Sequence, residues 1–165
     1  MIIVADSGSS KIDWRLLRKD GTIDQAHCDG FNPYYQPADH LRKNIRDTLL
    51  SLATEPVHAI YFYGTGVSST KNQGIVRSIF LEFFPKATVE IEWDLLAAAR
   101  ALCGQEPGIA CILGTGSNSC HYDGEKIIDQ VANLGWILAD EASGATIGKK
   151  FLFDYLRKRM PENLA

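Results

Sequence analysis

The sequence lacks a long apolar run, a strong excess of charge of either sign, and a basic leader ahead of its first apolar segment. A membrane-spanning helix needs about 20 apolar residues and a secretion signal needs a basic segment before an apolar one, so we predict neither. The net charge is −3, from 17 Lys and Arg and 20 Asp and Glu. This balance gives no strongly basic surface, so we expect no nucleic-acid and no membrane partner.

Cysteine is scarce as well. The four cysteines are Cys28, Cys103, Cys111 and Cys120. None of them stands in a Cys-x-x-Cys pair or at Cys/His ligand spacing, so we predict reduced, mostly buried thiols and no zinc site. Together with the absence of a leader, this pattern predicts a cytoplasmic protein.

What the chain does contain is the composition of a soluble globular protein. It has 165 residues, of which 45% are hydrophobic and 22% charged. A chain of this length can bury a core of its own and would ordinarily form one domain.

A glycine-rich loop interrupts an apolar run in the stretch 111–120. The run ends in Gly114-Thr-Gly-Ser-Asn-Ser119 and resumes as a hairpin that turns at Asp123-Gly124. Glycines let consecutive N–H groups converge on an anion, so the loop suits a phosphate. Because no Lys-Ser/Thr pair or helix follows it, it is neither a P-loop nor a dinucleotide fingerprint. A tight turn without a ligand remains the alternative.

A second loop of the same kind lies near the N-terminus. An apolar strand ends in Asp6-Ser-Gly-Ser-Ser-Lys11, and an alternating strand follows it. A carboxylate at a strand end beside hydroxyls and a lysine can hold a hydrated Mg²⁺ next to a polyphosphate. We therefore predict two phosphate loops, each between strands, with Asp6 meeting Mg²⁺ through water.

The apolar periodicity predicts a mixed α/β sheet in the order β-β-β-α-β-α-β-α, followed by the beginning of a second copy. The first set comprises strands near 2–5, 11–18 and 22–28, a helix over 38–53, a strand at 57–64, a helix over 72–84, a strand at 87–92 and a helix over 94–101. The second set comprises a strand at 109–113, a second strand that resumes at Cys120 and runs to the turn at Asp123-Gly124, a third near 126–131, and a helix over 142–158.

We therefore predict a first lobe over 1–106 and the start of a second lobe over 107–165. Three strands and one helix leave a sheet edge and an apolar face uncovered. For that reason we expect the chain to be the N-terminal part of a longer protein.

Two such units, each with a phosphate hairpin at its first turn, resemble the ribonuclease H-like fold of actin-like ATPases. Within that superfamily the motifs are similar to those of N-acetylglucosamine kinases and the related BadF/BadG/BcrA/BcrD activator ATPases. The resemblance implies that ATP phosphates contact both loops, and it makes Asp94, which opens an alanine-rich helix, the catalytic base. The implied phosphate-binding residues are Ser7, Gly8, Ser9, Ser10, Lys11, Gly114, Thr115, Gly116 and Ser117.

The resemblance also implies a sugar site. The implied substrate-binding residues are Asn32, Asp94, Asn118, Gly135, Trp136 and Asp140. Simpler interpretations remain open, because Asp94 could only cap its helix, Trp136 could only pack in a core, and the aromatic residues beside Asn32 could only cover the core edge. The family usually has glycine at four positions where this chain has Ser7, Ser9, Ala139 and Ala142.

The implied activity is transfer of the ATP γ-phosphoryl group to a hydroxyl of an amino sugar, most favourably N-acetylglucosamine, in a homodimer that uses ATP and Mg²⁺. One alternative is an ATPase that drives a conformational change in a partner protein. Another is a non-catalytic sugar sensor or scaffold. The family's adenine contacts are expected in the part of the fold that this sequence does not contain.

Overall fold

The computed structural model describes residues 1–164, which form two compact units that divide between Ala97 and Ala98. The division falls inside helix α3 (Asp94–Cys103), upstream of the boundary predicted after residue 106.

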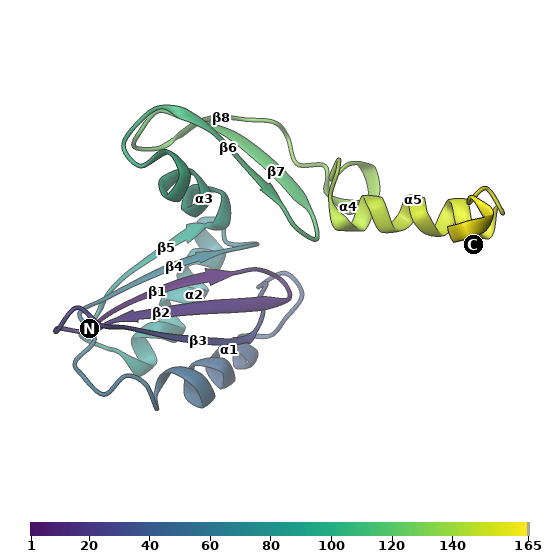
Figure 1. The fold of residues 1–165 in the computed structure, drawn as a ribbon. Coiled ribbons are helices and arrows are strands. Elements are labelled where there is room, and N and C mark those ends of the chain that lie inside the picture. The colour runs from purple at the N-terminus through teal and green to yellow at the C-terminus, as the bar shows by residue number, and fades with distance from the viewer. Residues whose placement is uncertain (165) are drawn as a thin grey trace. The chain divides into compact units, whose positions relative to one another are not determined.

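The first unit is a five-stranded mixed sheet with two helical segments (Figure 1). The strands run in the order β3-β2-β1-β4-β5, with β2 antiparallel to β1 and β3, and with β4 parallel to β1 and β5. The mixed sheet and the predicted order of elements are therefore confirmed. The elements are β1 (Ile2–Ser7), β2 (Lys11–Leu17), β3 (Ile23–Asp29), α1 (Ala38–Asn44), η1 (Ile45–Leu49), β4 (Ala59–Gly64), α2 (Thr70–Phe83) and β5 (Thr88–Trp93).

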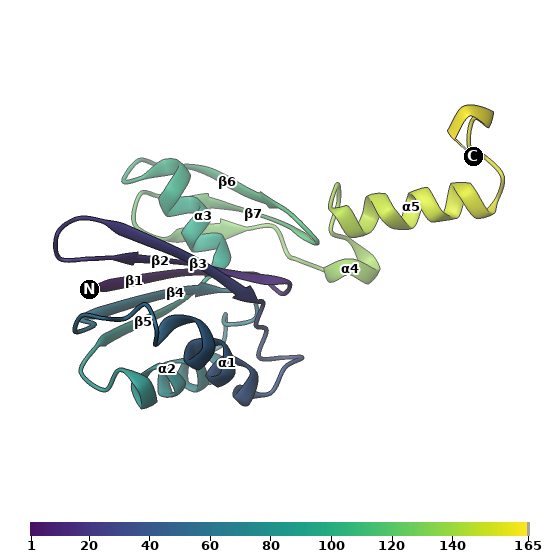
Figure 2. The same ribbon diagram turned by 60° about the horizontal axis from the view of Figure 1, so that its bottom comes forward.

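Alternation of apolar residues along the strands places the core on the sheet face that α1 and α2 cover (Figure 2). At its centre Trp14 packs against Phe62 and Phe80, with ring centroids 6.4 and 6.2 Å away. The Trp14 indole N–H donates to Cys28 Sγ at 3.2 Å, so the polar edge of the ring is satisfied. Packing of this core fixes the positions of β1, β4 and β5, whose carboxyl ends carry the candidate site.

The helix predicted over 38–53 is wrong in its detail. The α-helix ends at Asn44 and a π-helical turn, η1, follows, marked by the bond from the Leu50 N–H to the Ile45 carbonyl at 3.2 Å. The wider turn still buries Ile45 and Leu49, so the predicted apolar face is kept. Periodicity alone does not separate the two geometries.

The second unit contains the three-stranded antiparallel sheet β6 (Gly108–Leu113), β7 (Ser117–Tyr122) and β8 (Ile127–Gln130). Helix α5 (Gly144–Leu156) begins at Ser143, whose hydroxyl accepts from the Thr146 N–H at 3.2 Å. The short helix α4 (Gly135–Leu138) was not predicted, because four residues carry no periodicity. A 3-10 turn, η2 (Glu162–Leu164), closes the described chain.

Large apolar side chains of the second unit are exposed. Helix α5 has no buried residue, although a helix that is apolar on most sides is normally covered. The exposed α5 side chains are Ile147, Phe151, Leu152, Phe153, Tyr155 and Leu156. Through residue 164, no helix has both the length and the apolar character needed to cross a membrane.

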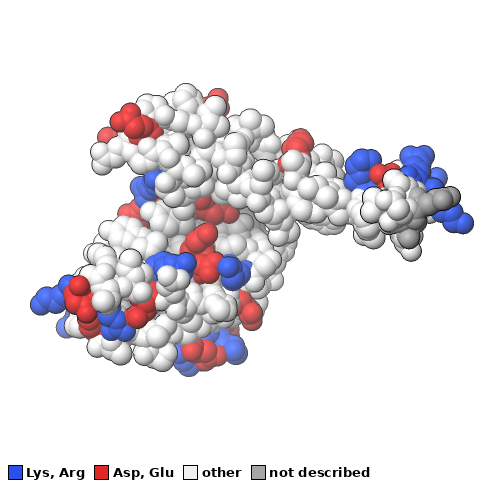
Figure 3. All heavy atoms as spheres, in the orientation of Figure 1, with Lys and Arg blue, Asp and Glu red and all other residues white. Residues whose placement is uncertain are grey.

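Charge of both signs is dispersed over the first unit in the view of Figure 3. Lys and Arg side chains gather instead near the end of α5 in the second unit. This face of the first unit therefore carries no large patch of one sign.

Candidate functional site

The carboxyl ends of three parallel strands meet at one edge of the first unit (Figure 1). The register aligns Ser7 of β1 with Gly64 of β4, and Gly64 with Trp93 of β5. Loops that follow parallel strands gather at this edge, which is the usual ligand position in α/β sheets. Asp6, predicted to meet Mg²⁺ through water, and Asp94, predicted as the catalytic base, therefore belong to the same edge.

The first phosphate loop is a tight turn from β1 to β2. The Gly8 N–H donates to the Lys11 carbonyl at 2.9 Å, whereas the N–H groups of Ser9 and Ser10 donate to no carbonyl of the described chain. Ser9 and Ser10 are exposed and can present those groups to an anion. Lys11 Nζ pairs with Asp13 Oδ2 at 2.7 Å, so its charge also lies at the loop.

Ser7, at the end of β1 where the loop begins, is completely buried. Its hydroxyl donates to the Phe31 carbonyl at 3.3 Å. The side chain is therefore occupied by a contact within the chain, and any contact of Ser7 with phosphate would have to come from its backbone.

Gly30 is a site residue that sequence reasoning missed. A Cβ added there would lie 2.4 Å from the Ser9 carbonyl carbon and oxygen and 2.5 Å from the Gly8 oxygen. The chain that leaves β3 thus passes directly against the first phosphate loop, and only glycine fits. In the sequence, the Asp29-Gly30 pair indicates a turn, but it does not indicate that the turn packs against the first phosphate loop.

The two carboxylates of the edge interact electrostatically. Burial, with the charge of Asp6 adding to it, raises the pKa of Asp94 above the ordinary 3.8, although the Leu95 N–H donates to Asp94 Oδ1 at 2.9 Å and opposes the rise. Burial also raises the pKa of Asp6, Asp13 adds to the rise, and Lys11 opposes it. This bond comes from the next residue rather than from the second or third residue of the helix, as in an N-cap, and the weakened acidity of Asp94 suits a proton acceptor.

Asp13 is the second residue that sequence reasoning missed. It stands directly opposite Asp6 in the β1–β2 register, so two carboxylates share one position of the sheet edge. Like charges directly opposite each other on two strands are destabilising, and the ammonium group of Lys11, 2.7 Å from Asp13 Oδ2, offsets part of this repulsion. The alternation of the strand after the first loop could have placed Asp13 on the face of Asp6.

These residues fit a magnesium ion that arrives with its nucleotide. Within residues 1–164 no group of three or more His, Cys, Asp or Glu side chains could hold a metal by itself. Mg²⁺ keeps several of its waters and is held in proteins by one or two carboxylates together with phosphates. Asp6, with Asp13 beside it, supplies that kind of partial site.

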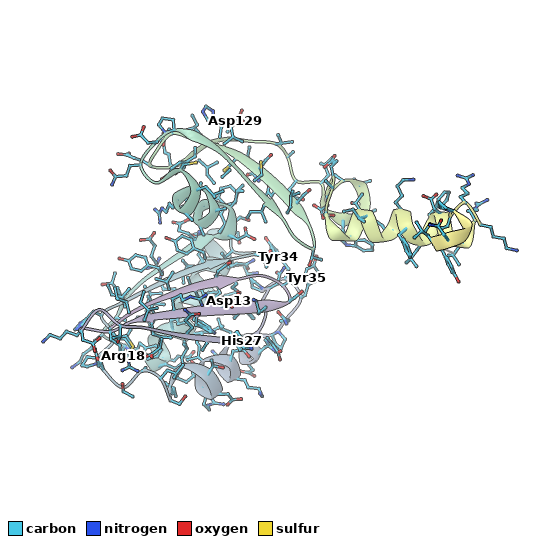
Figure 4. The ribbon with its side chains drawn as sticks, viewed as in Figure 1. Asp13, Arg18, His27, Tyr34, Tyr35 and Asp129 are labelled. Carbon is cyan, nitrogen blue, oxygen red and sulfur yellow. The ribbon has the colours of Figure 1, made fainter. Side chains whose placement is uncertain are left out.

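The loop after β3 places the predicted sugar ligand Asn32 at the same edge. Asn32 is buried, its Oδ1 accepts from the Tyr34 N–H at 3.0 Å, and its own N–H donates to Gln36 Oε1 at 2.7 Å. Phe31 belongs to the core, as the simpler interpretation proposed for the aromatic residues. Tyr34 and Tyr35 do not, because they are 62% and 81% exposed and lie beyond the strand ends, opposite the end that carries Arg18 (Figure 4).

The second phosphate loop is held by the N-terminus of α5. The N–H of Gly144 donates to the Gly114 carbonyl at 2.9 Å, and that of Ala145 donates to the Thr115 carbonyl at 3.2 Å. Within the loop, the Gly114 N–H donates to the Gly116 carbonyl at 2.9 Å. The loop therefore packs on a helix that begins only at Gly144, after two further strands' worth of chain, and the local sequence of the loop does not reveal this contact.

Asp140 lies against this loop with an unsatisfied oxygen. It is 7% exposed, its φ is 61°, and its Oδ1 has no hydrogen-bond partner among the described residues. A Cβ added at Gly116 would lie 3.0 Å from Asp140 Oδ2. A buried carboxylate oxygen without a donor is costly, so this one fits a ligand that brings a donor.

Asp140 and Asn118 line one cavity of about 270 Å³ in the second unit. Ser117, Ser119 and Asn133 add polar groups to its wall. Cavities with a few convergent polar groups are typical binding sites. Of the residues implied to bind substrate in the second unit, Asn118 and Asp140 are therefore brought together.

Trp136 and Gly135 lie outside the lining of that cavity. Trp136 is 60% exposed and Lys149 Nζ stands 5.7 Å from its ring centroid, so the tryptophan does not pack in a core of the described chain. Gly135 has a φ of 72° and open space where a Cβ would be. Their roles in sugar binding stay predictions.

At position 142 the family usually has glycine, and the backbone conformation of Ala142 gives a reason for that preference. Its φ is 60°, a left-handed conformation that favours glycine. Ala139 has an extended φ of −146° and carries no such strain.

Comparison with known proteins adds sequence similarity to this geometry. No protein-family model matches the chain, and no curated protein matches it. Among solved structures, a "putative N-acetylglucosamine kinase" of Porphyromonas gingivalis superposes with a TM-score of 0.91 and 39% identity, over 99% of this chain and 59% of that one.

Two further structures share the fold. A second "putative N-acetylglucosamine kinase", from Chromobacterium violaceum, gives a TM-score of 0.62 and 24% identity, over 90% of this chain and 54% of that one. A ROK hexokinase of Thermus thermophilus gives a TM-score of 0.55 and 17% identity, over 81% of this chain and 50% of that one.

The chain therefore has the actin-like ATPase fold. Within that fold it is similar to N-acetylglucosamine kinases, and the resemblance predicted from its motifs is confirmed. It spans 59% of the length of the Porphyromonas gingivalis protein.

Proposed function

We propose that the full-length protein is an ATP-dependent kinase that transfers the γ-phosphoryl group to a hydroxyl of an amino sugar, most favourably N-acetylglucosamine. The observation that carries the proposal is the half-buried Asp94, a carboxylate of raised pKa at the sheet edge that also bears the first phosphate loop. The 39% identity to a protein named for this activity supports the choice of substrate.

Phosphoryl transfer needs mainly positioning and neutralisation of charge. The N–H groups of Ser9 and Ser10 would bind phosphate oxygens of ATP, and Lys11 would add positive charge. Thr115 and Gly116 would contribute donors from the second loop. Mg²⁺, held by Asp6 through water, would offset charge on the phosphates.

Asp94 would act on the acceptor. The Leu95 N–H donates to Asp94 Oδ1 and so orients the carboxylate. The carboxylate would take the proton of the attacking sugar hydroxyl. The hydroxyl oxygen would then bond to the γ-phosphorus while the bond from that phosphorus to ADP breaks. The raised pKa makes Asp94 a stronger base than an exposed aspartate, which favours this role over helix capping alone.

Polar side chains of both units would hold the sugar. Asp140 offers Oδ1, which lacks a donor, to a sugar hydroxyl. Asn32, Asn118, Gly135 and Trp136 complete the proposed set, and an exposed indole suits the apolar face of a pyranose. A homodimer belongs to the same proposal on the resemblance alone, and a cytoplasmic location belongs to it on the cysteine pattern of the sequence.

ADP release by the full-length protein with Mg-ATP, measured with and without sugars, tests the proposal. We expect release to depend on an amino sugar and to be highest with N-acetylglucosamine. A slow rate that is the same with every sugar would reject the kinase and favour the alternative of an ATPase that acts on a partner protein.

A further inference from the structure

The turn between β4 and α2 contacts both the first phosphate loop and the loop that carries Asn32. The Thr65 N–H donates to the Ser7 carbonyl at 2.9 Å, which joins the turn to the first phosphate loop. The next residue, Gly66, lies against the Asn32 loop. A residue at this junction can influence substrate geometry without touching phosphate.

Gly66 is held from two sides. Its carbonyl accepts from Nδ2 of the buried Asn72 of α2 at 2.8 Å, and its φ is 76°. On the other side, a Cβ would lie 2.4 Å from Asn32 Oδ1 and 3.1 Å from Tyr34 Cδ2. Because the backbone of Gly66 is fixed by α2, an added side chain would have to displace Asn32.

The hydrogen bonds also determine which way the Asn32 amide points. The Tyr34 N–H can only donate, so the atom that faces it is the carbonyl Oδ1. In the described chain Nδ2 has no hydrogen bond to a protein group and is not a fully buried atom. Asn32 therefore offers donors, and its ligand group is an acceptor oxygen, such as a sugar hydroxyl or an acetamido carbonyl.

We propose that Gly66 is a positioning residue for the sugar: without a side chain it lets Asn32 keep the orientation that presents the amide N–H groups to an acceptor oxygen of the substrate. This inference rests on the proposed function for the identity of the ligand. The placement of Asn32 by Gly66 stands on the contacts alone.

The test compares Gly66→Ala with Gly21→Ala in the full-length protein. Gly21 has a φ of 87° and open space around it, and it lies in the turn from β2 to β3, so its variant carries the backbone strain without the collision. We expect Gly66→Ala to raise the KM for N-acetylglucosamine roughly tenfold to hundredfold, with the KM for ATP unchanged. Gly21→Ala should leave both constants unchanged.

Asn32→Asp provides the second comparison, because a carboxylate still accepts from the Tyr34 N–H but offers no donor. We expect it to weaken sugar binding, measured by calorimetry, as much as Gly66→Ala does. An unchanged sugar KM in Gly66→Ala would overturn the proposal, as would an equal rise in the ATP and sugar constants.

A readout independent of activity is the NMR signal of the Asn32 side-chain amide, assigned through Asn32→Asp. We expect this signal to move in Gly66→Ala and to stay in place in Gly21→Ala. A signal that stays in place in both variants would overturn the positioning role, whatever the enzyme does. If the wild-type protein binds no amino sugar while the signal moves, the proposed function is wrong and the positioning role stands.

Discussion

At the scale of single residues, the site depends on groups that are costly to the fold. Asp94 is a half-buried carboxylate near another carboxylate, and Asp140 keeps an unsatisfied oxygen and a left-handed backbone. Such costs concentrate at functional sites because substrate supplies the missing partner. Two predictions follow from Asp94.

The first prediction concerns catalysis. Asp94→Asn should lower kcat by roughly 10²- to 10⁴-fold, because the amide does not accept the hydroxyl proton, while ATP affinity stays nearly unchanged. Steady-state kinetics with N-acetylglucosamine and nucleotide titration would measure both. Asp129→Asn, a change of an exposed carboxylate on β8, serves as the control. Equal activity of Asp94→Asn and wild type would end the assignment of Asp94 as base.

The second prediction concerns stability against pH. The pKa of Asp94 is raised in the folded chain, so the folded state favours the protonated form, and stability is lost as pH rises from about 3.8 through the raised value. Asp94→Asn should therefore increase Tm by a few degrees at neutral pH. The difference from wild type should shrink in acid. A variant less stable than wild type at neutral pH would contradict this sign.

At the scale of elements, the loops of the first unit are a packed assembly. Gly30 meets the first phosphate loop, Ser7 binds the Phe31 carbonyl, and Thr65 binds the Ser7 carbonyl. Each contact joins segments that are far apart in the sequence. The shape of the phosphate loop is therefore set by its neighbours as well as by its own glycine.

Gly30→Ala tests this dependence. Because the new Cβ would overlap the Ser9 carbonyl, the loop must shift, and we expect the KM for ATP to rise roughly tenfold or more. Gly74→Ala in α2 adds a methyl group in open space and should leave the KM unchanged. Wild-type ATP kinetics in Gly30→Ala would show that the contact does not shape the loop.

Element boundaries were predicted well where the apolar pattern is strong, as in the continuous apolar runs of β1 and β4 and the alternating residues of β2. The π-helical turn η1 and the short helix α4 were not predicted, since both depend on a few backbone hydrogen bonds rather than on a pattern of side chains. Of the site, the two glycine-rich loops, Asp6 and Asp94 came from motifs. Gly30, Asp13 and Gly66 did not, because their significance lies in what they touch.

At the scale of the whole chain, the two units differ in how completely they are covered. The first unit buries a core built around Trp14, Phe62 and Phe80. Among the described strands of the second unit the buried apolar residues are only Ala110, Cys120 and Tyr122. Burial of apolar area supplies most of the stability of a fold, so the first unit should be the more stable one.

Hydrogen exchange of the 165-residue chain would measure this difference. Amides of β1 and β4 should exchange at least roughly tenfold more slowly than those of β6 and β7, because fewer apolar contacts oppose local opening of the second unit. Trp14→Ala should remove most of the protection in the first unit. Equal protection of the two sheets in the unmutated chain would contradict the prediction.

The sequence by itself determined the α/β order of elements, the two glycine-rich hairpins and the resemblance to amino-sugar kinases, because apolar periodicity and glycine-rich turns are local properties. Only the tertiary structure decided which distant groups meet. The parallel register of β1, β4 and β5 brings Asp6 and Asp94 to one edge, and the absence of a side chain at Gly66 leaves room for Asn32. Such contacts depend on strand register and helix packing, which no short segment encodes alone.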